Sequence, residues 1–361
     1  MPAIHAARRA RAQRLIRESA ADAALITARP NVRYLTGLAS SNAALLLPAD
    51  GDGALLATDF RYVGAAHRDA PDVELIEERF IEPRLVTEAS RRGFGRLAFE
   101  AHEMTVERHT ELMARAEGLA TLSFGRKIES LRTVKDAEEL DKLEVACRLS
   151  DAALAEVLPQ IRPGLSERML ATRIDHAMAL LGADRPAFDT IVASGPNGAI
   201  PHHVPTEREL RAGDLVTMDF GALHAGYHAD MARTVAIGSV ADWQRDIYDL
   251  VARAQRSGIA ALEDGVETGA VDAAARDLIE AAGHAAHFQH GLGHGVGLEL
   301  HEAPLLGYGR TGKLTDRVPV TVEPGVYLPG KGGVRIEDVL VVTAGDRARF
   351  LTSTTRELLV L

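Results

Sequence analysis

The chain has almost no cysteine and no long apolar run. Cys147 is the single cysteine among 361 residues, which excludes an internal disulfide and is typical of a reducing compartment. No stretch approaches the roughly 20 apolar residues that a membrane-spanning helix needs, and no apolar segment of secretory length follows the N-terminus. There is also no low-complexity tract and no repeat of the solenoid type. We therefore expect a cytoplasmic protein that does not bind membranes.

The chain also lacks an excess of positive charge. Its formal net charge is −10, which disfavours nucleic acid or an anionic membrane as a partner. The content of 46% hydrophobic and 25% charged residues is ordinary for a globular protein, and 361 residues suffice for two domains with separate cores. Composition thus favours a globular two-domain protein.

The N-terminal part has the pattern of an α/β layer. Short apolar segments at 23–27, 43–47, 54–58, 73–76 and 96–99 read as strands, with helices expected between them. A long helix should then open the second domain, because Asp136 can cap its N-terminus with Glu139 three residues later. A further helical pattern covers 165–181. We place the domains at 1–130 and 131–361.

Four acidic residues occupy matched positions in the C-terminal part. Asp219 and Asp230 belong to two strand-like segments joined by glycine-containing turns, and Glu323 and Glu337 belong to a second such pair. The pattern Val-Thr-apolar-acid-x-Gly occurs at 216–221 and again at 320–325. One acid near a strand end is usually solvated, but that explanation does not account for two matched pairs. The repetition predicts two β-hairpins related by pseudo-two-fold symmetry across a shared site.

An imidazole completes this set. His294 has glycine on both sides, in a segment that places His290, His294 and His301 within twelve residues. Flanking glycines allow close backbone approach and leave the ring free to bind a metal. Four carboxylates and one imidazole would repel one another without cations between them, and hard divalent cations prefer oxygen-rich ligands.

These segments resemble the pita-bread metallopeptidases, a family that includes aminopeptidase P, prolidase, methionine aminopeptidase and the metal-free creatinases. The blocks that carry the resemblance are Met-Asp-Phe-Gly at 218–221, Gly-Tyr-His-Ala-Asp-Met at 226–231, Gly-His-Gly-Val-Gly at 293–297, Val-Glu-Pro-Gly at 322–325 and Arg-Ile-Glu-Asp at 335–338. The N-terminal part places the chain nearer to the aminopeptidase P and prolidase branch. The resemblance implies an N-terminal creatinase/prolidase-like α/β domain and a C-terminal pita-bread catalytic domain, an α/β (α+β) fold overall.

The resemblance also implies roles for individual residues. Asp219 would chelate one metal, Asp230 and Glu337 would bridge two metals, and His294 with Glu323 would complete the second metal's ligands. The nucleophile would be a hydroxide between two divalent cations, which lower the pKa of a shared water. His202 would bind substrate and stabilise charge on the tetrahedral intermediate, and His301 would contact the scissile carbonyl and move protons. The same resemblance implies that His290 lies near the bound proline, that Glu323 also acts as the base, and that Arg335 and, less directly, Asp338 hold the ligands by hydrogen bonds. We expect His203 and His228 to be lining or surface residues.

The function that follows is that of a metal-dependent Xaa-Pro aminopeptidase, active on peptides with proline at the second position. We expect two divalent cations, manganese before cobalt or zinc, and a homodimer. The nearest alternative is a prolidase restricted to Xaa-Pro dipeptides, for which Arg310 is a candidate to bind the free carboxylate. A metal-free creatinase-like hydrolase and a non-catalytic binding scaffold are the other classes, and both disagree with the complete ligand set.

Overall fold

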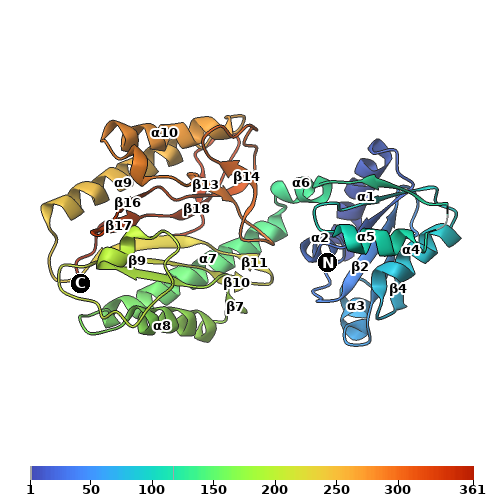
Figure 1. Ribbon diagram of the computed structural model, residues 1–361, viewed down its shortest axis with the longest axis horizontal. Coiled ribbons are helices and arrows are strands. Elements are labelled where there is room, and N and C mark those ends of the chain that lie inside the picture. Colours follow the sequence, from blue (N-terminus) through green and yellow to red (C-terminus); the bar gives the residue numbers. More distant parts are fainter. Residues whose placement is uncertain (1, 117) are drawn as a thin grey trace. The chain divides into compact units, whose positions relative to one another are not determined.

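The chain forms two compact units, an N-terminal unit that ends at Arg132 and a C-terminal unit that spans Thr133–Leu361. The structure is a computed structural model that describes residues 2–116 and 118–361. Figure 1 colours the chain along its sequence, so the blue to blue-green elements belong mainly to the first unit and the green to red elements to the second. Each unit has its own sheet and its own hydrophobic cluster.

The N-terminal unit is built on one six-stranded mixed sheet with the order β4-β3-β2-β1-β5-β6. Its strands are β1 (Ala23–Ile26), β2 (Ala43–Pro48), β3 (Leu55–Thr58), β4 (Glu74–Glu77), β5 (Arg96–Phe99) and β6 (Ala120–Ser123). Its helices are α1 (Pro2–Glu18), α2 (Arg29–Thr36), α3 (Val63–Asp69), α4 (Ile81–Arg91), α5 (Val106–Met113) and α6 (Lys127–Thr133).

The central strands of this sheet are apolar because both of their faces are covered. Every residue of β1 and β2 is buried. Leu25 of β1 shares a hydrophobic cluster with Leu85 and Val86 of α4, while Ala24 and Ile26 alternate to the other face. The five strands predicted in this part are confirmed to within two residues, and β6 is a sixth strand that the sequence pattern did not predict.

The C-terminal unit contains four long helices and several small sheets. The helices are α7 (Ala137–Val157), α8 (Glu167–Leu180), α9 (Asp242–Ala260) and α10 (Thr268–Ala281). Its first strands are β7 (Arg185–Pro186), β8 (Ile191–Ser194), β9 (Leu215–Phe220), β10 (Ala222–His224), β11 (Tyr227–His228) and β12 (Met231–Ala236). The later strands are β13 (Gly293–Gly295), β14 (Glu302–Leu306), β15 (Pro319–Val322), β16 (Gly325–Leu328), β17 (Gly332–Arg335), β18 (Asp338–Val341) and β19 (Arg349–Phe350). Three short 3₁₀ turns complete the list: η1 (Leu158–Gln160), η2 (Gly195–Ala199) and η3 (Ala285–His287).

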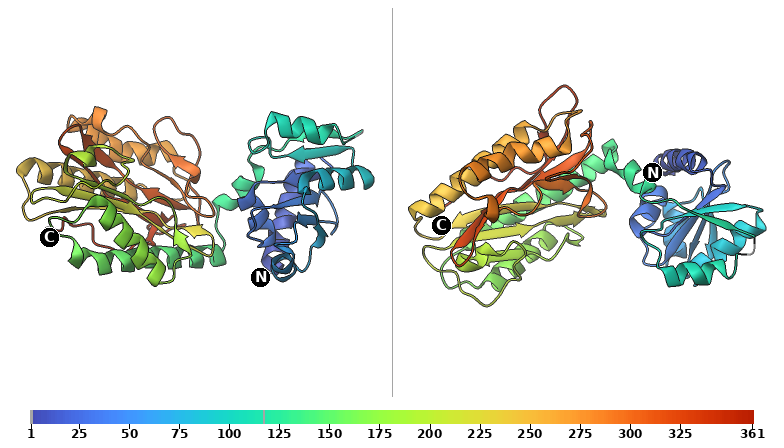
Figure 2. Two further views of the ribbon diagram at one scale, coloured as in Figure 1. Left: turned by 60° about the horizontal axis from the view of Figure 1, so that its bottom comes forward. Right: turned by 45° about the horizontal axis from the view of Figure 1, so that its top comes forward.

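Each half of this unit repeats a helix pair followed by strands. Residues of α7 and α8 share one hydrophobic cluster with β9 and β12, and residues of α9 and α10 share another with β15 and β18. In Figures 1 and 2 the strands lie between the two helix pairs. Strand β12 pairs antiparallel with β9, and β18 pairs antiparallel with β15. Both predicted hairpins are therefore confirmed, and their repetition agrees with the predicted pseudo-two-fold symmetry.

The start of α7 follows the predicted capping pattern. The Asp136 carboxylate accepts from the Glu139 N–H, and the Glu139 side chain accepts from the Asp136 N–H. These two bonds satisfy helix N-terminal donors that would otherwise have no partner. Among the described helices, none combines the length and the apolar character needed to cross a membrane.

Candidate metal centre

The four predicted acidic ligands lie where neighbouring strands end or begin. Asp219 is in β9 and Asp230 directly precedes β12, while Glu323 directly follows β15 and Glu337 directly precedes β18. The antiparallel pairing brings the two members of each pair to the same end of their strands, because Asp219 lies opposite Ala232 and Val322 lies opposite Asp338. Sequence positions that are far apart thus converge on one place.

Glycines permit the close backbone approach that this convergence needs. A Cβ atom on Gly293 would lie 2.0 Å from the Thr321 carbonyl oxygen, and one on Gly295 would lie 2.4 Å from that of Ala303. These distances are far below any van der Waals contact, so larger residues would push β13 away from its neighbours. The close backbone approach predicted for the glycines beside His294 is confirmed.

All five predicted ligand residues form one group, which we call the five-residue cluster: Asp219, Asp230, His294, Glu323 and Glu337. Overlapping sets of their ligand atoms lie within 4.8 Å of one another, and one set also includes His301. The His294 Nε2 atom is 3.5 Å from an Asp230 oxygen and 3.6 Å from a Glu323 oxygen. Such spacing is wide for hydrogen bonds and suits atoms that share a cation.

Electrostatics within the cluster disfavour four bare carboxylates. Burial, together with the neighbouring Asp230 carboxylate, raises the pKa of Glu323 to about 8. Burial also raises the pKa of Asp219 to about 6 and that of Glu337 well above its ordinary range. Burial opposes the charged form of His294, but Asp230 and Glu323 outweigh it and raise the His294 pKa to about 9. Protons therefore occupy positions in the cluster that cations could take.

Two fully buried carboxylate oxygens of the cluster have no hydrogen-bond partner among the described residues. These are Oδ1 of Asp219 and Oε1 of Glu337, and both are buried. A buried acceptor without a partner costs about 1–3 kcal/mol, so native proteins rarely keep one without a ligand. The His294 ring also points a ligand atom into the cluster. Its Nδ1–H donates to the Gly295 carbonyl, which leaves Nε2 to face the carboxylates. The donor set fits divalent cations.

A cavity of about 410 Å³ opens onto the cluster. Four predicted catalytic residues line it, namely His202, His290, His301 and Glu323, together with all the other predicted ligands and Arg335. Phe188, Ile191 and Leu300 give part of its wall an apolar character. His301 lies beside His294, with ring centroids 4.1 Å apart. The structure thus brings every predicted metal ligand, the four predicted catalytic residues and Arg335 to one cavity.

A hydrogen-bonded row links a ligand to the cavity wall. Arg335 donates to Asp219 and, over 2.8 Å, to the Tyr327 hydroxyl. His290 Nε2 is 2.9 Å from the same hydroxyl, and His290 Nδ1 is 2.8 Å from the Gly291 carbonyl. Because a carbonyl only accepts, Nδ1 carries the proton and the Tyr327 hydroxyl donates to Nε2. Sequence analysis missed Tyr327, whose only signal was an aromatic hydroxyl two residues beyond Glu-Pro-Gly.

Three residues named from the sequence lie away from the cavity. His203 is buried against Glu167, 2.9 Å from its carboxylate, and is neither a lining nor a surface residue. His228 contacts the Gly297 carbonyl and does not line the cavity either. Arg310 is exposed and is absent from the cavity wall. Their sequence positions near the motifs did not determine where their side chains point.

Asp338 has a larger role than its sequence position suggested. Its buried carboxylate accepts from Arg233, Gln255, Thr352 and Arg356. Arg233 also donates to the main-chain carbonyl of Glu337. Asp338 therefore joins the strand that begins after Glu337 to α9 and to the C-terminal segment, which fixes the backbone of a ligand.

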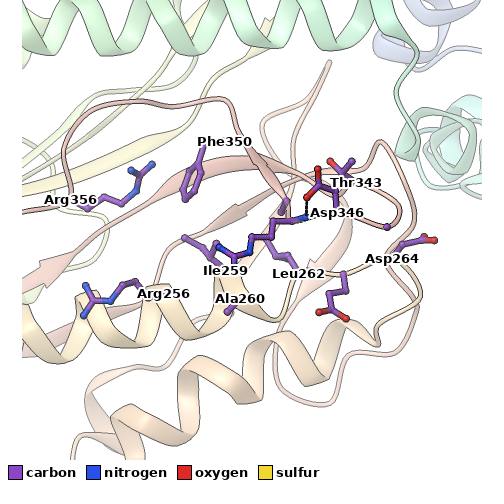
Figure 3. A pocket seen from close by; sticks show the side chains of 13 residues that line it. Arg256, Ile259, Ala260, Leu262, Asp264, Thr343, Asp346, Phe350 and Arg356 are labelled. Atoms are coloured by element: carbon purple, nitrogen blue, oxygen red, sulfur yellow. Dashed lines mark hydrogen bonds between the residues drawn. The ribbon is translucent and has the colours of Figure 1, made fainter.

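A larger cleft lies elsewhere on the C-terminal unit (Figure 3). It is bounded by the end of α9 and the segment before β19, with Arg256, Phe350 and Arg356 among its lining residues. Arg356 is already paired with Asp338, and the Asp346 carboxylate accepts from the Arg347 N–H. This cleft shares no residue with the five-residue cluster. Its size therefore says nothing about the candidate metal centre.

Comparison with known proteins agrees with this geometry. The sequence model of one protein family, metallopeptidase family M24, matches residues 141–344. The sequence model of the Creatinase/Prolidase N-terminal domain matches residues 8–134. The chain belongs to metallopeptidase family M24. Within M24 it is 33% identical over 340 residues to a Xaa-Pro dipeptidase of Pyrococcus horikoshii, which covers 94% of both chains.

Solved structures of M24 peptidases have the same architecture. A Xaa-Pro dipeptidase from Bacillus anthracis is 34% identical, with a TM-score of 0.94 over 99% of this chain and 100% of that one. An X-Pro aminopeptidase from Thermotoga maritima is 32% identical, with a TM-score of 0.89 over 96% and 100% of the two chains. The predicted fold, a creatinase-like N-terminal domain followed by a pita-bread domain, is confirmed. The chain is a metallopeptidase, and its family implies divalent metal ions.

Proposed function

We propose that this metallopeptidase is a Xaa-Pro dipeptidase, which hydrolyses the bond between a first residue and a C-terminal proline. The comparisons favour this alternative over the aminopeptidase prediction, because Xaa-Pro dipeptidases are prominent among the similar proteins. The observation that carries the proposal is a small cavity beside buried carboxylate oxygens that have no protein partner among the described residues.

The size and wall of the cavity support a short substrate. A volume of about 410 Å³ is near the lower end of the roughly 300–1,000 Å³ usual for ligand sites. An Xaa-Pro bond has no N–H, and its ring prevents the extended pairing that general peptidases use, so its recognition needs a shaped wall. Phe188, Ile191 and Leu300 supply apolar surface for a prolyl ring.

The five-residue cluster would hold two divalent cations. We assign Asp219 to one cation, Asp230 and Glu337 to a bridging position, and His294 with Glu323 to the other cation. Bound cations would supply Lewis acidity and lower the pKa of a water molecule. We propose manganese, since oxygen-rich ligands tolerate it, with cobalt or zinc as alternatives that affinity alone does not exclude. Arg335 holds Asp219 from behind and so orients this ligand.

The residues around the cluster would bind and move protons. Burial and the neighbouring His294 lower the pKa of His301, so its ring is neutral near pH 7 and can accept or donate at Nε2 or Nδ1. His202 is exposed and lines the cavity, where it would bind the substrate and stabilise the charge that develops on the substrate carbonyl oxygen. Glu323 lines the cavity and would accept the proton of the attacking water and pass it to the leaving nitrogen.

His290 has a different task in this proposal. Burial lowers its pKa to about 4, and both of its ring nitrogens are already hydrogen-bonded inside the protein. A neutral ring with no free nitrogen cannot transfer protons. We therefore assign His290 to the shape of the wall next to proline.

A three-peptide assay tests the proposal. The manganese-loaded protein is incubated with Gly-Pro, Ala-Pro-Ala and Ala-Ala-Ala, and products are identified by chromatography. A dipeptidase should hydrolyse Gly-Pro, leave both tripeptides intact and lose activity with a chelator. Asp230→Ala serves as the matched inactive protein. Cleavage of Ala-Ala-Ala in preference to Gly-Pro would overturn the proline specificity.

The second candidate is a Xaa-Pro aminopeptidase, which the likeness to the Thermotoga maritima structure supports. Release of alanine from Ala-Pro-Ala would favour it over the dipeptidase. A metal-free creatinase-like hydrolase or a binding scaffold would purify without stoichiometric metal and show no chelator-sensitive cleavage. Metal analysis by mass spectrometry separates these two classes from both peptidases.

A further inference from the structure

One buried carboxylate, Glu167, lies outside the cavity and yet binds the segment that carries His202. Glu167 is the first residue of α8 and has no exposed surface. Its carboxylate accepts six hydrogen bonds, three at each oxygen. Burying a charged carboxylate costs free energy, and these six donors offset that cost. A fully satisfied buried network of this kind rigidifies the segments that it joins.

The six donors come from both sides of His202. Oε1 accepts from Ser194 N–H, Ser194 Oγ and Asn197 Nδ2 at 2.7–2.9 Å. Oε2 accepts from His203 Nε2, Thr206 N–H and Thr206 Oγ1 at 2.7–3.1 Å. We call residues 195–206 the His202 loop, and Glu167 with its four partners the Glu167 clamp. The clamp holds the loop at both flanks of His202.

The clamp is electrostatically suited to a charged glutamate. Burial would raise the pKa of Glu167, but the hydrogen bonds from Ser194, Asn197, His203 and Thr206 outweigh it and lower the pKa to about 2. The positive end of α8 favours the same charge. Arg208 orients the Ser194 hydroxyl, because its Nη1 donates to Ser194 Oγ over 2.6 Å and Ser194 Oγ in turn donates to Glu167.

The loop has a second anchor on the cavity side. Arg335 donates to the main-chain carbonyl of Pro201 over 3.1 Å, and a Cβ on Gly198 would lie 3.0 Å from the Gly333 nitrogen. The residue before His202 is thus tied to the metal ligands through Arg335, and the residue after it is tied to Glu167. Neither Glu167 nor His203 lines the cavity, so a substrate bound there would not contact either side chain.

We propose that Glu167 and His203 are positioning residues that set the place of the His202 ring relative to the five-residue cluster. This inference rests on the proposed role of His202 in binding substrate. Displacing a contacting group by about 1 Å can reduce a rate by about 100-fold, so a clamp of this kind affects catalysis without contacting the reacting atoms.

Glu167→Gln tests the clamp with almost no change of volume. In either orientation its new NH₂ group faces a backbone N–H, that of Ser194 or that of Thr206, and a backbone N–H cannot become an acceptor. One side of the clamp must therefore open. Glu100→Gln is the matched control, because Glu100 is also fully buried and accepts from the backbone of Thr27 and Ala28, but belongs to the N-terminal unit.

The first measurement does not depend on activity. Hydrogen–deuterium exchange followed by mass spectrometry should show faster exchange in peptides that cover 195–206 in Glu167→Gln, and no such change in Glu100→Gln. Unchanged exchange in the His202 loop overturns the clamp, whatever the enzyme does. If wild-type protein cleaves no Xaa-Pro dipeptide, the proposed function fails while this measurement still decides the clamp.

The second measurement is a double-mutant cycle with Gly-Pro as substrate. Glu167→Gln should lower kcat by about 10- to 100-fold in the wild-type background and by less than about 3-fold in the His202→Ala background, because the two residues act as one unit. Equal losses in both backgrounds would mean that Glu167 acts on general stability, which refutes the proposal.

A milder pair of variants covers the case in which Glu167→Gln does not fold. His203→Gln keeps an N–H donor for Glu167, whereas His203→Leu removes it, and each alters one of the six bonds. We expect His203→Gln to retain kcat within about 3-fold and His203→Leu to lose more, with faster exchange in the His202 loop. Equal kcat and equal exchange in the two variants would overturn the role of His203.

Discussion

In the protein from which the divalent cations have been removed, the free energy of unfolding should fall as pH rises from 6.5 to 8. In the metal-free protein, burial raises the pKa of Glu323 from its ordinary 4.5 to about 8. The pKa of His294 rises from 6.5 to about 9, because Asp230 and Glu323 outweigh the effect of its burial. Both groups bind protons more tightly in the folded chain than in the unfolded chain. Their contribution to stability is therefore present at low pH and lost as pH rises through the folded pKa values.

The two windows overlap between pH 6.5 and 8. Glu323 loses its contribution from pH 4.5 up to about 8, and His294 loses its contribution from pH 6.5 up to about 9. One group in the steep part of its window changes stability by about 1.4 kcal/mol per pH unit. With the flattening near each pKa included, the two groups together should lower the free energy of unfolding by about 3 kcal/mol across this interval.

Urea unfolding of chelated and manganese-loaded protein at pH 6.5 and 8 measures the effect. The loaded protein should not lose stability over this interval, because bound cations require deprotonated ligands and bind more tightly as protons leave. Glu323→Gln cannot titrate, and it removes one of the two carboxylates that raise the pKa of His294. The decrease in the chelated variant should therefore be smaller than the wild-type decrease by at least roughly 1.5 kcal/mol. A chelated wild-type protein whose free energy of unfolding stays constant or rises would refute this account of the cluster.

Three substitutions test other parts of the site. Asp230→Ala should abolish turnover of Gly-Pro with little change in the melting temperature of the metal-free protein, because losing its repulsion of Glu337 offsets losing its attraction to His294. Wild-type turnover would contradict its bridging role. Tyr327→Phe removes the hydroxyl between His290 and Arg335. Urea unfolding should therefore show a free energy of unfolding that is lower by about 1–3 kcal/mol, and an unchanged midpoint would show that this hydroxyl does not stabilise the fold. Asp338→Asn breaks a buried ion-pair network and should cost about 3–5 kcal/mol in the same assay; a loss below about 1 kcal/mol would rule out its anchoring role.

The local pattern of the sequence was sufficient for the secondary elements near the site. Apolar and β-branched residues beside Asp219 and Glu323 predict strands because such side chains pack well on a pleated, buried surface, and β9 and β15 lie there. The matched Val-Thr-apolar-acid pattern also predicted the repetition of two hairpins. Such features depend on neighbours within a few residues, so they can be predicted from the sequence.

Contacts between side chains that are far apart in the sequence could not be predicted in this way. The bond from His203 to Glu167 joins residues 36 positions apart, and the bond from Arg335 to Pro201 joins residues 134 positions apart. Nothing in the residue types distinguishes His203, which is buried in the clamp, from His202 beside it, which faces the cavity. The direction of each ring follows from how α8 and β17 pack around the loop.

The sequence by itself determined which ligands are available, since side-chain chemistry and strand periodicity are local properties of the chain. Only the tertiary structure decided how these ligands meet and what supports them. Packing of the two helix pairs on their strands buries the carboxylates, leaves oxygens of Asp219 and Glu337 without protein donors among the described residues, and limits the cavity to about 410 Å³. Burial and distance are properties of the folded chain, which is why the shifted pKa values and the cavity volume follow from it alone.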